Sequence, residues 1–140
     1  MSRDRLRGDE SGVSSLELSV IAPSLLLLIF FVVQVAFYLY GRTVALQAAR
    51  EGVSQLRLEQ NPQDFAIAEP GVKSNVETFA KNIGTGSLDN PAMKATYSDA
   101  KGRVTVTVTG ETVSLVPFLG LHLHVTETVS GQVERFQDGG

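Results

Sequence analysis

The sequence predicts an α+β protein: a long N-terminal transmembrane helix extends into a small head with a short helix and a three- to four-stranded antiparallel sheet. Three observations support this prediction. An uncharged apolar run lies near the N-terminus, a helical pattern of small residues follows it, and valine alternates with threonine around residue 105. Helices that precede the strands, instead of alternating with them, are typical of the α+β class.

Composition limits the classes of function. The 140-residue chain has a formal net charge of -3 and no cysteine. A net negative charge gives no reason to expect nucleic-acid binding. The lack of cysteine excludes disulfides and thiolate metal sites. Outside the apolar run about 100 residues remain, which is enough for one small domain with a modest core.

The apolar run is long enough to cross a membrane. It begins at Leu18, ends at Tyr40 and has no charge over 23 positions, where about 20 apolar residues suffice. Leucine, isoleucine, phenylalanine and valine fill 15 positions, which favours insertion by about 4 to 9 kcal/mol. A cleaved secretory signal would have a shorter apolar region and a small-residue site after it. Pro23 can kink the span, and Tyr40 suits the headgroup level.

A glycine and a glutamate precede this run. Residues 1–12 hold three arginines and three acidic residues, and Gly12 is followed by Val13. Glycine before a scissile bond loosens the helix and leaves the backbone accessible to a peptidase. Glu17 lies at the rim of the run, where an ionisable group is a functional hypothesis by default; the free amine of a neighbouring chain's Val13 would be its partner. Alternatively, Glu17 only complements the helix dipole, with Ser14 in a capping box.

The stretch Gly-Val-Ser-Ser-Leu-Glu-Leu-Ser-Val-Ile-Ala-Pro at residues 12–23, followed by leucines, resembles the TadE-like family. The stretch Leu-Gln-Ala-Ala-Arg-Glu-Gly at residues 46–52 is also similar to the segment after the helix in that family. Its members are pilin-like or pseudopilin proteins of Tad (Flp-type) pilus systems. The resemblance implies that a prepilin peptidase cuts after Gly12 on the cytoplasmic face and that Glu17 supports assembly. It also implies, as partners, the pilus assembly platform and other pilin-like subunits.

These features predict a leader at residues 1–12, a transmembrane helix with its extension at residues 13–60 and an extracytoplasmic head at residues 61–140. We expect a single pass through the cytoplasmic membrane, an N-terminus in the cytoplasm, contact with lipid and self-association through the N-terminal helix. The predicted function is that of a minor pilin or pseudopilin, incorporated in a surface pilus. The alternative is an uncleaved, singly anchored extracytoplasmic module for binding or adhesion.

A helix is expected to continue beyond the span. At residues 43–59, small and apolar residues recur at spacings of three and four, which places them on one helix face. This face can pack either on the head or on another copy of the chain. Its members are Ala45, Ala49, Val53 and Leu56.

A loop and a short helix are expected next. Asn-Pro and Pro-Gly pairs predict a loop at residues 61–71. A capping-box pattern then opens a helix at residues 74–83, and glycines at residues 84–86 end it. One face of this helix carries Val76, Phe79, Ala80 and Ile83.

The C-terminal part is predicted to form an antiparallel meander. Residues 103–109 alternate strictly between valine and threonine, which indicates a strand with one buried and one wet face. A turn at residues 99–102 precedes it. Val-Pro-Phe-Leu at residues 116–119 is either an exposed docking patch or a plug over the sheet. The other strands are expected at residues 94–98, 111–116 and 121–134.

The sequence shows no catalytic constellation. His122 and His124 are the two histidines and point to the same face of the last strand, but the next residues on that face are threonines. Surface histidines are therefore expected, with no metal and no cofactor. Without a histidine base near a nucleophile there is no recognisable triad, so we do not expect an enzyme.

Overall fold

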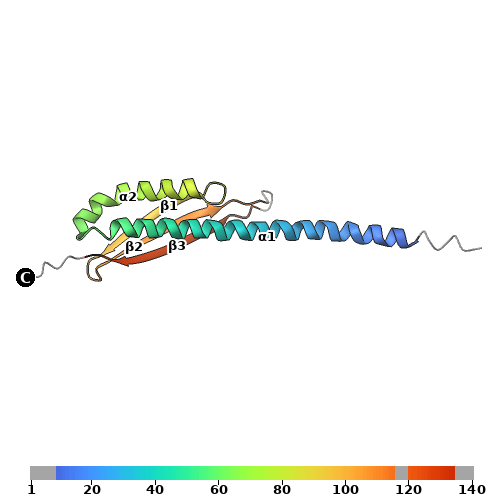
Figure 1. Ribbon diagram of the computed structural model, residues 1–140, viewed down its shortest axis with the longest axis horizontal. Helices are drawn as coiled ribbons and strands as arrows, with labels where there is room; N and C mark the ends of the chain where they lie inside the picture. Colours follow the sequence, from blue (N-terminus) through green and yellow to red (C-terminus); the bar gives the residue numbers. More distant parts are fainter. Residues whose placement is uncertain (1–8, 116–119, 135–140) are drawn as a thin grey trace, which may run out of the picture. The chain divides into compact units, whose positions relative to one another are not determined.

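The computed structural model describes residues 9–115 and 120–134, with side chains from residue 14 onward. The described elements follow one another as α1 (Asp9–Leu56), α2 (Pro62–Ile83), β1 (Asp89–Ser98), β2 (Arg103–Thr112) and β3 (Leu123–Gln132). Within this part of the chain the strands form one antiparallel sheet in the order β1-β2-β3 (Figure 1). The predicted α+β class is confirmed. The Val-Pro-Phe-Leu stretch at residues 116–119 lies outside the described residues.

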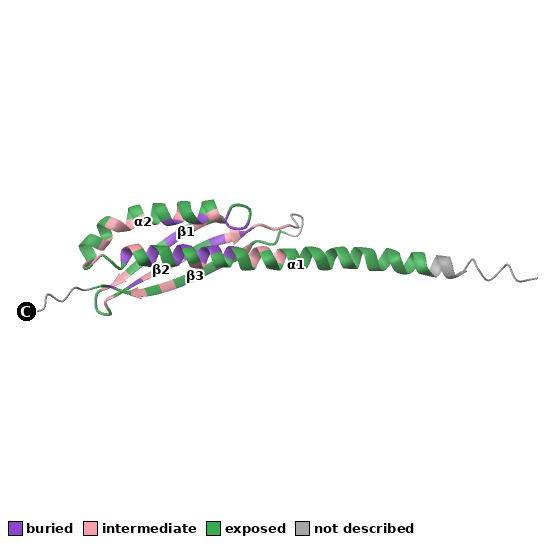
Figure 2. Cartoon of the chain, in the orientation of Figure 1, coloured by how far each residue is buried: buried purple, intermediate pink, exposed green. Residues whose placement is uncertain are grey.

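The chain divides into two compact units, Met1–Val35 and Ala36–Gly140. The first contains the apolar half of α1. The second contains the rest of α1 together with α2 and the sheet. Burial differs between the two halves of α1: from residue 41 onward one stripe of the helix is buried, as Figure 2 shows, whereas residues 14–33 are all exposed.

Small residues let α1 approach the sheet closely. Ala45, Ala48 and Ala49 are fully buried. A Cβ atom added to Gly52 would lie 3.0 Å from Val106 Cγ1, so a side chain at this position would press on the sheet. The predicted apolar face of the helix extension is thus confirmed, and it packs on the head. The helix ends at Leu56, three residues before the predicted end at residue 59.

The sheet has one buried face and one polar face. The inward side chains Val104, Val106 and Val108 are at most 1% exposed. On the other face, hydroxyl groups of β2 and β3 pair across the strands. Thr105 Oγ1 lies 2.9 Å from Ser130 Oγ, and the Thr107 and Thr128 hydroxyls are also 2.9 Å apart. The predicted alternation of β2 is therefore confirmed.

The loop predicted at residues 61–71 is wrong, because α2 begins at Pro62. Asn61 caps the helix: its side-chain oxygen accepts a hydrogen bond from the Asp64 N–H at 2.9 Å. Pro62 is well tolerated in the first turn, where its missing N–H is not needed. Pro70 lies inside the helix and removes one backbone hydrogen bond. Packing of the first turns on the core, including the ring of Phe65 at 5.5 Å from that of Tyr97, offsets this loss.

The predicted capping box at residues 74–77 is also wrong, since Ser74 lies in the middle of α2. Glu77 instead accepts a hydrogen bond from the Met93 N–H of β1 at 3.0 Å. Val76 and Ala80 are buried as expected, whereas Phe79 is 37% exposed. The predicted helix stop is confirmed, because the N–H of Gly84 donates to Ala80 O at 2.8 Å.

The strand boundaries differ from the prediction at three places. The strand predicted at residues 121–134 is shorter, because β3 spans Leu123–Gln132, and His122 lies just before it. β1 starts at Asp89, five residues before the predicted residue 94, and its register shifts between Asp89 and Ala92. Pro91 is compatible with this irregular stretch because β1 is an edge strand. The strand predicted at residues 111–116 is not separate: Thr112 ends β2, and residues 113–115 lie outside the sheet. The turn at residues 99–102 is confirmed, with Gly102 at φ 54°.

A matched pair of glycine substitutions tests the close packing of α1. Gly52→Val should lower the free energy of unfolding of the head by about 1 to 3 kcal/mol more than Gly71→Val, because only the first change overpacks the core. Gly71 is the control: it also lies inside a helix, but a Cβ atom there meets nothing within 4 Å. Thermal or urea unfolding followed by circular dichroism measures the difference. Equal losses for the two variants would contradict the packing argument.

Candidate functional site

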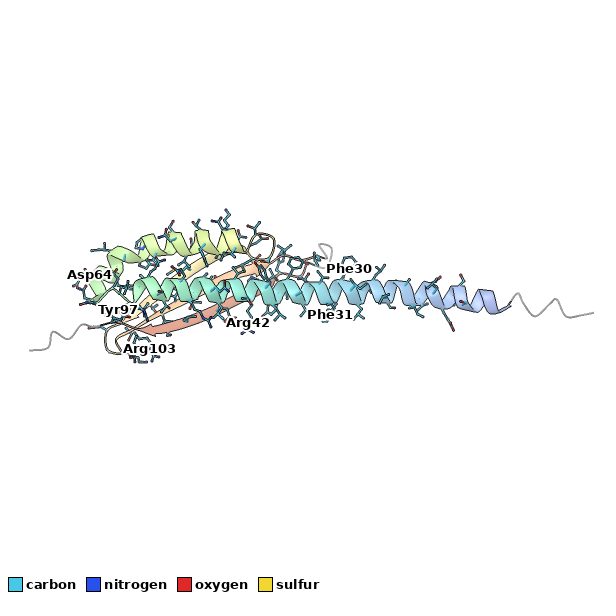
Figure 3. The ribbon with its side chains drawn as sticks, in the orientation of Figure 1. Phe30, Phe31, Arg42, Asp64, Tyr97 and Arg103 are labelled. Carbon is cyan, nitrogen blue, oxygen red and sulfur yellow. The ribbon has the colours of Figure 1, made fainter. Side chains whose placement is uncertain are left out.

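The first part of α1 exposes apolar side chains on all sides. Phe30 and Phe31 project from different sides of the helix (Figure 3), and both are exposed. Among the described residues, α1 is the one helix that is long and apolar enough to cross a membrane. A helix that is apolar all round needs an apolar surrounding. The candidate site is therefore this anchor together with its two ends.

The two serine hydroxyl groups of the apolar run donate hydrogen bonds within the helix. Ser19 donates to Ser15 O and Ser24 to Val20 O, each at 2.8 Å. Such bonds matter in lipid, where no water satisfies polar groups. Pro23 lies inside the helix and lacks an N–H for the carbonyl one turn before it. Leu18 is well exposed, as expected for the start of a span.

The N-terminal end of the anchor holds the predicted processing residues. The backbone of Gly12 and Val13 is helical, because α1 begins at Asp9. The capping box proposed for Ser14 and Glu17 is not formed, because Ser14 lies inside the helix. The Glu17 side chain is exposed and forms no ion pair or hydrogen bond with any described residue.

The C-terminal end of the predicted span contacts the head directly. The Tyr40 hydroxyl donates a hydrogen bond to Ile83 O, the last carbonyl of α2, at 3.3 Å. A Cβ atom on Gly41 would lie 3.0 Å from both Ser87 O and Thr112 Cγ2. The tertiary contacts of the head therefore begin within the last turn of the predicted span, where Tyr38 packs against the core, without a linker. Sequence reasoning placed Tyr40 at the headgroup level but missed these contacts.

Two ion pairs connect α1 to the β3 side of the sheet. Arg42 donates to the carboxylate of Glu127, whose side chain is only 14% exposed. This hydrogen bond and the carboxylate charge raise the pKa of Arg42 above its usual value. Farther along, Arg57 Nη2 lies 3.1 Å from Glu134 Oε1, and the Glu134 N–H donates to Arg57 O at 3.1 Å. The sequence signal for the first pair was Glu127. It falls on the same face of β3 as Val125 and Val129, and a carboxylate on a face that is otherwise apolar needs a partner.

The histidines lie on the surface beside one carboxylate. His124 Nε2 is 3.2 Å from Glu111 Oε1, and His122 Nδ1 is 3.7 Å from Glu111 Oε2. Both side chains are more than two thirds exposed. In the part of the chain that the structure describes, no group of three histidine, cysteine or acidic residues could hold a metal ion. The arrangement therefore offers hydrogen bonding at the surface and no evident chemistry.

Comparison with known proteins finds one family whose model matches the N-terminal helix. Residues 12–54 match the model of a family described as TadE-like protein, in agreement with the resemblance drawn from the sequence. The match runs from Gly12 through the predicted span and includes all of the buried stripe of α1 except Leu56. The match covers less than half of the chain. Searches of curated proteins and of solved structures found no match.

Two truncations test where the head begins. A chain that starts at Ala36 should be soluble and show one cooperative thermal transition, because residues 36–140 form a compact unit. A chain that starts at Arg57 should show no such transition, since it lacks the α1 side of the core. The comparison uses gel filtration and circular dichroism. Cooperative unfolding of the shorter chain would show that α1 is not required. The side chains that it would lose from the core include Val44, Ala45, Ala48, Ala49, Val53 and Leu56.

Proposed function

We propose that this chain is a pilin-like structural subunit, a minor pilin or pseudopilin, of a Tad/Flp-type pilus. It is made as a membrane-anchored precursor, cut after Gly12 by a prepilin peptidase and assembled through its N-terminal helix. One observation carries the proposal: the family match starts at Gly12 and covers the anchor and its extension, residues 12–54. The head then faces the extracytoplasmic side, and the N-terminus lies in the cytoplasm.

Processing after Gly12 requires the first turns of α1 to open. The scissile bond lies in a helical stretch, and a peptidase needs extended backbone. Glycine lowers the cost of leaving the helix by about 1 kcal/mol relative to alanine. It also places no side chain next to the bond. Cleavage creates a free amine on Val13, four residues from Glu17.

Glu17 is proposed to hold neighbouring subunits in register. Its carboxylate has no partner among the described residues of its own chain, and a carboxylate in a membrane is costly unless paired. The amine of Val13 on a neighbouring subunit supplies the opposite charge. As subunits leave the bilayer, helix-to-helix packing replaces lipid around the exposed leucines and phenylalanines. The function is therefore mechanical and uses no catalytic residue.

Substitution of Gly12 tests the processing step. Gly12→Ala should leave the precursor uncut, because the Cβ atom obstructs the peptidase and strengthens the helix. Gly8→Ala, a second glycine of the leader, is the control and should be cut normally. Intact mass of protein extracted from membranes separates a start at Val13 from the full chain. An unprocessed wild-type chain would instead favour the uncleaved, singly anchored binding module.

Substitution of Glu17 tests assembly. Glu17→Gln should be inserted and cut but be absent from sheared surface filaments, a loss of at least about tenfold if the pair is buried. Glu51→Gln is the control, since Glu51 is an exposed glutamate of α1 within the head. Immunoblots of sheared and membrane fractions measure the distribution. Normal amounts of the Glu17 variant in filaments would remove this role from Glu17.

A further inference from the structure

The two edges of the sheet differ in how far their backbone groups are satisfied. The β1 edge lies beside α2 (Figure 1), and Glu77 of that helix accepts a hydrogen bond from the Met93 N–H at 3.0 Å. Pro91, also in β1, has no N–H to offer. The opposite edge is β3, which pairs with β2 alone among the described strands. The β1 edge is thus partly closed to another strand, whereas β3 has a whole side without a strand next to it.

Alternate residues of β3 direct their backbone groups away from β2. Just after the strand, the Val133 N–H donates to Gly102 O at 2.9 Å, so residue 133 bonds toward β2. Antiparallel pairing alternates bonded and unbonded residue pairs, so the odd-numbered residues of β3 bond to β2 and the even-numbered ones point outward. Within the described chain no hydrogen bond reaches the outward N–H and C=O groups of these even-numbered residues, which we call the open edge. They are His124, Thr126, Thr128, Ser130 and Gln132.

The head part of α1 runs alongside this edge. Arg42 pairs with Glu127, and Arg57 pairs with Glu134. The two arginines are 15 residues apart, which is about 22 Å along a helix. The two glutamates are 7 residues apart, which is about 23 Å along a strand. Because these lengths match, the helix and β3 run side by side and in the same direction.

Arg50 lies between the two paired arginines and has no counter-charge. It follows Arg42 by 8 residues and precedes Arg57 by 7, which places it within about 80° of both around the helix. Its side chain is exposed and forms no ion pair or hydrogen bond with any described residue. At the same height β3 has Ser130 and Gly131, which carry no charge. A carboxylate beside the open edge would therefore complete the series of ion pairs.

A hollow of about 230 Å³ lies between the head part of α1 and β3. It is lined by Leu39, Arg42, Thr43, Leu46 and Glu127. A strand added to the open edge would lie about 4.8 Å from β3, and every second side chain would point toward α1. The distance from Arg42 to Arg50 along the helix is about 12 Å, the length of about four residues of a strand. One face of an added strand can therefore reach both the hollow and Arg50.

We propose that the open edge binds an extended, acidic segment of another protein by strand addition. The segment pairs antiparallel with residues 124–132 and places an apolar side chain in the hollow. Four residues toward its own N-terminus, it places a carboxylate at Arg50. The ion pairs of α1 stay in place. A second copy of β3 does not supply this charge, because Glu127 is its one carboxylate and is already paired and largely buried. The proposal adds a partner-binding strand outside the family match at residues 12–54.

Binding of a defined peptide tests this proposal. The probe is a fluorescein-labelled peptide with blocked ends and the sequence Thr-Glu-Thr-Val-Thr-Leu-Thr, added to the full chain in detergent micelles. Fluorescence anisotropy should show saturable binding, and Arg50→Gln should weaken it about threefold. Lys94→Gln, which changes an exposed cation on β1, is the control and should bind as the unchanged chain does. Replacing the peptide's glutamate by glutamine should also weaken binding and should abolish the effect of Arg50→Gln.

Amide hydrogen exchange tests the backbone pairing. In the free chain the N–H groups of Thr126 and Thr128 should exchange as unbonded amides, whereas those of Val125 and Val129 are protected by β2. The peptide should slow exchange of the first two at least about tenfold. A peptide N-methylated at its two central threonines should not bind, because the N–H groups that face β3 are then missing.

Three outcomes overturn the proposal. The first is no saturable binding up to about 1 mM peptide. The second is binding that survives both N-methylation and Arg50→Gln, since such binding uses neither the open edge nor the charge. The third is protection of Thr126 and Thr128 in the free chain, because a second copy or another part of the chain then already covers the edge. Neither readout involves cleavage after Gly12 or insertion, so each of these outcomes leaves the proposed function standing.

Discussion

Close packing of a small-residue helix face on a sheet is the constraint on which the head depends. Alanine at three buried positions and glycine at residue 52 bring α1 onto the valines of β2. The sheet contributes to the same approach, since a Cβ atom on Gly131 would lie 2.5 Å from Val53 Cγ1. Dispersion contacts at this distance are individually weak but numerous. Larger side chains would push the helix away and expose the inward face of the sheet to water.

The two halves of α1 differ in the character of their exposed surfaces. Before residue 36 its side chains are apolar on every side, whereas from Gly41 onward one stripe is buried and the opposite one is polar. The change occurs within a few residues, and Tyr40 and Gly41 already contact the head. Because no linker intervenes, the core of the head begins where the span is predicted to end.

Linear patterns were predictable, and contacts between distant residues were not. The apolar run could be read directly from the sequence, and the valines of β2 followed from alternation. The roles of Gly12 and Glu17 stay predictions. The first half of α2 was missed although Asn61-Pro62 is a recognised helix start; the later Pro70-Gly71 pair outweighed it. The contact of Tyr40 with Ile83 depends on how the chain folds back. No local pattern encodes it.

The ion pair between Arg42 and Glu127 has a consequence for crowded subunits. β3 is an edge strand, and such strands tend to pair with strands of other molecules. Glu127 points inward from this edge, largely buried, and its partner is on α1 of the same chain. A foreign strand that displaced α1 from this edge would leave the carboxylate without its counter-charge. The pair therefore disfavours strand pairing that would displace α1 from this edge.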